Sequence, residues 1–137
     1  PCADPVDRYL DDAYVLAKAD HMPENLRREL VATCCRGALE AAAQAKVRAI
    51  RLGRGDTHVD VEDALAGART TNQQLTLAVF DDPLRGSDLL PHLNQQLGRW
   101  AANALQACKE GAHHGFPGDL LGLITDTKKL ARWVVQS

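Results

Sequence analysis

The sequence predicts an all-α protein, a helical bundle of five to seven helices around one long central helix. Apolar residues recur at spacings of three and four along most of the chain, which is typical of amphipathic helices. Alanine is abundant and aromatic residues make up only 4% of the chain, so closely approaching helices are expected. β-branched residues do not alternate with polar ones over a useful length, so no strand is predicted.

Size and charge limit the possible classes of protein. The 137 residues are 45% hydrophobic and 25% charged, which is enough for one globular core. The chain starts at Pro1 rather than Met, so we expect residues 1–137 to form a single helical domain of a longer protein. A net charge of -2 argues against a globally basic nucleic-acid-binding protein but leaves room for a local basic patch.

The first two helices are predicted from their start signals. Asp4 is a good N-cap before Pro5, and the apolar spacing continues to about Ala19. The longest helix opens at Pro23 and ends at about Leu52, before two glycines, with a length of about 43 Å. Its buried stripe is expected to consist of Leu30, Cys34, Ala38, Ala41, Ala45, Ala49 and Leu52.

Shorter helices follow in the middle of the chain. Thr57 is a capping residue for a helix through Ala68, and a second apolar helix covers 75–80. These two pieces could also form one kinked helix. Ser87 is predicted to cap the next helix, and Gly98 either ends that helix or bends it.

Two more helices complete the predicted bundle. One covers 99–114 and stops at a Gly/Pro turn over 115–118. The last begins after Gly118 and Asp119. Its buried face is expected to consist of Leu120, Leu123, Ile124, Thr127, Leu130, Ala131 and Val134.

The paired histidines at the end of the 99–114 helix are the candidate catalytic residues. His113 and His114 can act as acid or base near neutral pH. Lys109 or Arg99 on the same helix could stabilise the charge of a phosphate.

The polar face of this helix also offers candidate binding residues, Asn103 and Glu110. Two plainer interpretations remain open. The polar row can be an ordinary solvated face of an amphipathic helix. Either histidine can simply interact with the negative C-terminal end of the helix.

The segment Lys109-Glu110-Gly111-Ala112-His113-His114 resembles the signature of the HEPN superfamily of helical bundles. Lys109 matches the arginine of that signature, and His114 matches its histidine. The resemblance implies a bacterial defence protein: a metal-independent ribonuclease acting mostly as a dimer, or a non-catalytic helper fused to an ATPase module. Lysine in place of arginine favours the non-catalytic kind, because an ammonium does not reproduce the planar guanidinium fork at a phosphate.

A basic cluster lies at the end of the long predicted helix. Arg48, Arg51 and Arg54 can complement the negative end of that helix, or they can bind nucleic-acid phosphate.

The four cysteines, Cys2, Cys34, Cys35 and Cys108, fit neither a zinc site nor a disulfide framework. A reducing cytoplasm is therefore expected, with Cys34 and Cys35 as small core residues or as fillers of a helix interface. No metal, cofactor or membrane span is predicted.

The expected function is a non-catalytic interaction or oligomerisation domain of a larger multidomain protein, associated with nucleic acid in bacterial defence. The alternative is a metal-independent HEPN-type endoribonuclease that uses His113 or His114 with Lys109 or Arg99. Expected partners are a second copy of the chain, other domains of the parent protein, and RNA or DNA.

Overall fold

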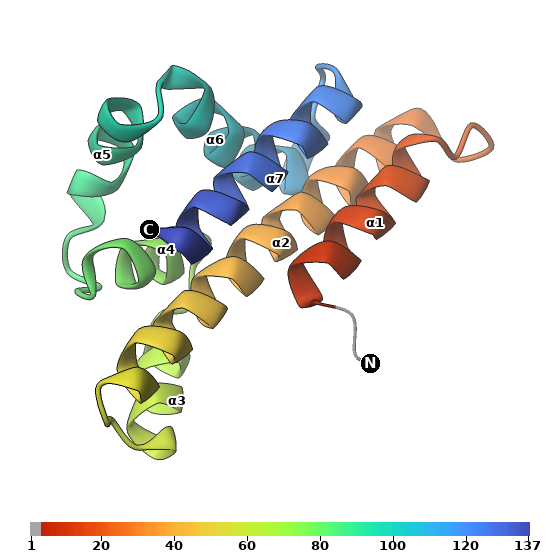
Figure 1. The fold of residues 1–137 in the computed structure, drawn as a ribbon. Helices are drawn as coiled ribbons and strands as arrows, with labels where there is room; N and C mark the ends of the chain where they lie inside the picture. The colour runs from red at the N-terminus through yellow and green to blue at the C-terminus, as the bar shows by residue number, and fades with distance from the viewer. Residues whose placement is uncertain (1–3) are drawn as a thin grey trace.

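The computed structural model describes residues 4–137, so Cys2 lies outside the described part (Figure 1). The described residues form an all-α bundle with no strand, as predicted. A short 3₁₀ turn, Gly86–Asp88, separates the fourth and fifth helices. The helices are α1 (Pro5–Ala17), α2 (Glu24–Gly53), α3 (His58–Gly67), α4 (Thr71–Phe80), α5 (Leu89–Gln96), α6 (Arg99–His114) and α7 (Leu120–Gln136).

The long helix α2 is the centre of the bundle, as predicted. It packs against α1, α3, α4, α6 and α7. In Figure 1, α1 and α7 run beside α2, while α3 folds back at its C-terminal end. α2 therefore positions these five helices, while α5 packs against α4 and α6.

The predicted buried stripe of α2 is wrong. Ala45 and Ala49 are exposed, and Ala38 is the only member of the predicted stripe that is fully buried. The cause is that α2 has neighbours on several sides and carries alanine around much of its circumference, so periodicity does not define one face. The residues that α2 buries are Val31, Ala32, Cys35, Ala38, Leu39, Ala42, Ala43 and Val47.

Side-chain caps begin α1 and α3 as predicted. The Val6 backbone N–H donates to Asp4 Oδ1 at 2.9 Å, and the Asp60 N–H donates to Thr57 Oγ1 at 3.1 Å. The cap predicted at Ser87 is wrong, because the 3₁₀ turn takes that place. Asp88 then precedes α5 without a side-chain cap.

Helical structure breaks between α3 and α4 and again between α5 and α6. α3 and α4 are separate helices, because Thr70 and Gln73 form a capping box that starts α4 anew. α5 and α6 are also separate. Gly98 has a φ of +121°, a conformation that favours glycine, and it turns the chain before Arg99.

Helix α6 lies very close to α2. A Cβ added at Gly111 would lie 2.7 Å from the Cβ of Ala32, so only glycine fits there.

The predicted buried face of α7 is confirmed in full, since all seven of its residues are buried. α6 therefore buries one side against α2 and α7 and leaves its polar side exposed.

Candidate functional site

Helix α6 spreads the predicted catalytic residues over its whole length. Arg99 is its first residue and His113 is near its last, which separates them by about 21 Å at 1.5 Å per residue. Within one chain, Arg99 does not share a site with the histidines. Lys109 does, because it lies one helical turn before His113 on the same side.

Lys109 and His113 line a surface groove of about 450 Å³. α2 contributes Arg36 and Glu40, and the start of α4 with the turn before it contributes Arg69, Thr70 and Thr71. We call this the cationic groove. Arg36 and Arg69 were not predicted as site residues.

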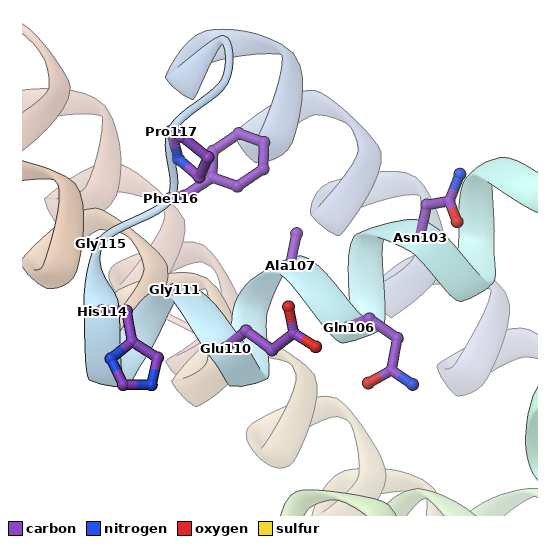
Figure 2. A pocket seen from close by; sticks show the side chains of 9 residues that line it. All are labelled: Asn103, Gln106, Ala107, Glu110, Gly111, His114, Gly115, Phe116 and Pro117. Carbon is purple, nitrogen blue, oxygen red and sulfur yellow. The ribbon is translucent and has the colours of Figure 1, made fainter.

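The second histidine faces another hollow. His114 and Glu110 line a pocket of about 520 Å³, together with Gln106 and Asn103. Figure 2 shows these side chains along α6, with Phe116 and Pro117 on the loop that leaves the end of the helix. The two imidazole rings are 6.2 Å apart between centroids and tilted by 55°. His113 thus lines the cationic groove and His114 lines the larger pocket.

A third hollow of about 280 Å³ shares lining residues with each of the other two. Its lining includes Lys109 and His113 from the groove and Glu110 and His114 from the pocket. The result is one continuous polar surface along α6, which we call the α6 surface. It consists of Asn103, Gln106, Lys109, Glu110, His113 and His114.

The turn after α6 is held by the start of α2. Arg28 Nη1 donates to the backbone oxygens of Phe116 and Gly118, at 2.9 and 2.7 Å. Gly115 has a φ of +82°, and a Cβ there would lie 2.8 Å from Asn25 Oδ1. The loop that follows His114 is therefore held against α2.

The predicted basic cluster at the end of α2 is paired within the fold. Arg48 Nη2 lies 3.0 Å from Glu62 Oε1 on α3, and hydrogen bonding to Arg48 lowers the pKa of Glu62. Arg51 and Arg54 both contact Asp81 at the end of α4, at 3.0 and 2.6 Å. These arginines tie α2 to α3 and α4.

Two cysteines lie between α2, α6 and α7. Cys35 and Cys108 are fully buried, and Cys108 Sγ is 3.4 Å from Thr127 Oγ1. Hydrogen bonding to Cys108 and burial raise the pKa of Cys35 above its usual range. Burial also raises the pKa of Cys34 to about 11. Neither Cys34 nor Cys35 is therefore an activated nucleophile, and Cys35 is a core residue.

The chain matches no protein-family model, no curated protein and no solved structure. Within residues 4–137, no three His, Cys, Asp or Glu side chains are grouped to hold a metal ion. None of the described helices has the length and apolar character to cross a bilayer.

Proposed function

We propose that this domain is a non-catalytic interaction module of a larger protein, and that the α6 surface is its contact surface. One observation carries the proposal: six polar side chains line connected hollows and use none of their hydrogen-bonding capacity inside the described fold. Polar groups held on a rigid helix in this way are available to a partner. The cytoplasmic setting, the bacterial defence context and the HEPN-like assignment belong to this proposal.

The surroundings of the histidines favour binding over catalysis. A histidine that acts as general base is ordinarily oriented by a second group that hydrogen-bonds its other ring nitrogen. Among residues 4–137, neither His113 nor His114 has such a hydrogen bond. Both rings are exposed at the end of α6.

The order of opposite charges along α6 favours a second copy of the chain as the partner. Lys109 and Glu110 are neighbours of opposite charge near the middle of the α6 surface. In a two-fold symmetric contact, the same patch meets itself with its direction reversed. Two antiparallel α6 helices centred here place each Lys109 opposite the Glu110 of the other copy.

Charge reversal tests this contact. We expect Lys109→Glu and Glu110→Lys to weaken dimerisation each by about tenfold, because each creates like-charge contacts. The double variant restores both pairs and should recover dimerisation. Sedimentation equilibrium gives the dimer dissociation constants, with Lys128→Glu on the exposed face of α7 as the control. A double variant as weak as the single ones overturns the proposed contact.

A metal-independent endoribonuclease is the second candidate, favoured by one observation. Lys109 and His113 line the same groove, so an acid or base and a phosphate-binding cation are close together. Incubation of the purified domain with mixed RNA in EDTA tests this candidate. Cleavage that is lost in His113→Ala and kept in His114→Ala supports it. No cleavage, or cleavage unchanged in both variants, rejects it.

A further inference from the structure

We infer that the cationic groove binds phosphate, and that the ligand is the phosphodiester backbone of a nucleic acid. The inference deepens the proposed function, because it rests on Lys109 and His113, which also belong to the α6 surface. It assigns the nucleic-acid contact to Arg36 and Arg69, which do not belong to the Arg48, Arg51 and Arg54 cluster.

The groove is assembled by the fold from three separate elements. Arg36 and Lys109 are half-buried on α2 and α6, and Arg69 is exposed in the turn before α4. α2 packs against both α4 and α6, so it fixes the backbone from which Arg36 and Lys109 project and the start of α4 next to Arg69. Binding therefore has to order only the long side chains that line the groove.

Arg36, Arg69 and Lys109 line one groove and have no counter-ion within residues 4–137. Arg8, Arg99 and Arg132 also have none, but they do not line this groove. Arg27, Arg28, Arg48, Arg51, Arg54 and Arg85 each contact a carboxylate. Among the ion pairs of residues 4–137, none involves Arg36, Arg69 or Lys109. The chain has 18 acidic and 16 basic residues, so an excess of positive charge in the composition does not explain the grouping. Like charges held together are costly, and a bound anion offsets that cost.

The one carboxylate that lines the groove, Glu40, is hydrogen-bonded to Thr71 and forms no ion pair with these cations. Glu40 Oε2 accepts a hydrogen bond from Thr71 Oγ1 at 2.6 Å, at the first residue of α4. The positive end of the α4 dipole favours a carboxylate at this position. Thr70 Oγ1 is also engaged, since it accepts the Gln73 N–H. The groups available to a ligand are therefore Arg36, Arg69, Lys109 and His113.

The guanidinium and ammonium groups favour phosphate as the ligand, and the open shape of the groove favours a polymer of phosphodiesters. Guanidinium forks bind phosphate oxygens through two parallel hydrogen bonds, and lysine adds a point charge. The groove is open at the surface and continues past Lys109 and His113 into the hollow beside Glu110 and His114. A chain of nucleotides can lie along the groove beside Arg36 and Arg69.

Fluorescence anisotropy with a labelled short single-stranded RNA, and with DNA of the same sequence, tests the inference. We expect binding that weakens steeply as salt rises. Arg36→Gln/Arg69→Gln should weaken it by at least about tenfold, because two phosphate contacts are lost. The matched control is Arg48→Gln/Arg132→Gln, which removes the same charge from α2 and α7 and should stay within about twofold. Circular dichroism confirms that both variants are folded.

Each other outcome has a definite meaning. No binding at low salt, or equal losses in the two double variants, overturns the inference. Adenosine 5′-monophosphate and inorganic phosphate serve as competitors. If either binds as tightly as the oligonucleotide, the groove takes a free phosphate and the nucleic-acid source is rejected. The Arg36→Gln/Arg69→Gln variant leaves the Lys109–Glu110 contact intact, so its dimerisation reports separately on the proposed function.

Discussion

Arg28 joins the beginning of α2 to the loop after α6, donating a hydrogen bond of 2.9 Å to the backbone oxygen of Phe116, 88 residues away. The same Nη1 atom reaches Gly118 at 2.7 Å, and Nε pairs with Glu24. The side chain is only 26% exposed, so these bonds are partly shielded from water. The end of the α6 surface is consequently fixed by the central helix.

Removal of this link should destabilise the domain. Arg28→Ala leaves two backbone oxygens without their charged donor, and we expect a loss of about 1–3 kcal/mol in the free energy of unfolding. Urea denaturation followed by circular dichroism measures it. The control is Arg132→Ala on exposed α7, expected to change stability by less than about 0.5 kcal/mol. Equal effects of the two substitutions would show that Arg28 has no special structural role.

The close approach of α6 to α2 gives a second prediction. Gly111→Ala places a methyl group 2.7 Å from the Cβ of Ala32 and 3.1 Å from that of Phe116. Neither neighbour is a flexible side-chain end, so the helices must separate, at a cost of about 1–3 kcal/mol. Gly67→Ala meets nothing within 4 Å, so it should be neutral or slightly stabilising. Thermal unfolding of the two variants compares them directly, and a Gly111→Ala domain as stable as the wild type contradicts the packing described.

Asp81 should make stability depend on pH in the acid range. Burial opposes its ionisation, but hydrogen bonding and charge from Arg54 and Arg51 outweigh burial and lower the pKa of Asp81. Because the folded pKa is depressed, this stabilisation is complete above the unfolded pKa of about 3.9 and is lost as pH falls below it.

The matched variant is Asp81→Asn. Asp81 has a φ of +56°, which asparagine also tolerates, so the backbone is kept. We expect a loss below about 1 kcal/mol at pH 7, since the pair is partly solvated, and no loss at pH 2. Urea unfolding at both pH values is the measurement. A deficit of the same size at pH 2 would assign the effect to the turn rather than to charge.

The thiols should be unreactive in the folded state. Cys35 and Cys108 are fully buried, and burial raises the pKa of Cys34 to about 11. Iodoacetamide at pH 7.5 should therefore label these three residues slowly, and all of them rapidly in guanidinium chloride. Peptide mass mapping locates the label. Fast native labelling of Cys35 or Cys108 contradicts their place in the core.

The fold could be predicted well where one face of a helix is buried. α7 packs on one side and carries leucine there, so its apolar spacing identified all seven buried residues. The same spacing did not identify the buried residues of α2. This helix carries alanine on most of its faces, and other helices contact it on several sides. The 3₁₀ turn at Gly86–Asp88 was missed, since Ser87 looks like an ordinary helix cap.

The site could be predicted only in part. The predicted site residues were groups that lie close together in the sequence. Lys109 and His113 do share a groove. Arg48, Arg51 and Arg54 instead pair with carboxylates up to 30 residues away. Arg36 and Arg69 belong to different elements, and no local pattern connects them. Their convergence depends on how α4 and α6 pack against α2, which periodicity does not specify.

The mass of the unmodified domain in solution tests the central claim, that the α6 surface is a contact surface for a second copy. Light scattering after size exclusion, over a wide range of loading concentrations, is the measurement. The proposal predicts a mass that rises from the 14.9 kDa of one chain towards twice that value as concentration increases. A mass that stays at 14.9 kDa at every concentration contradicts it.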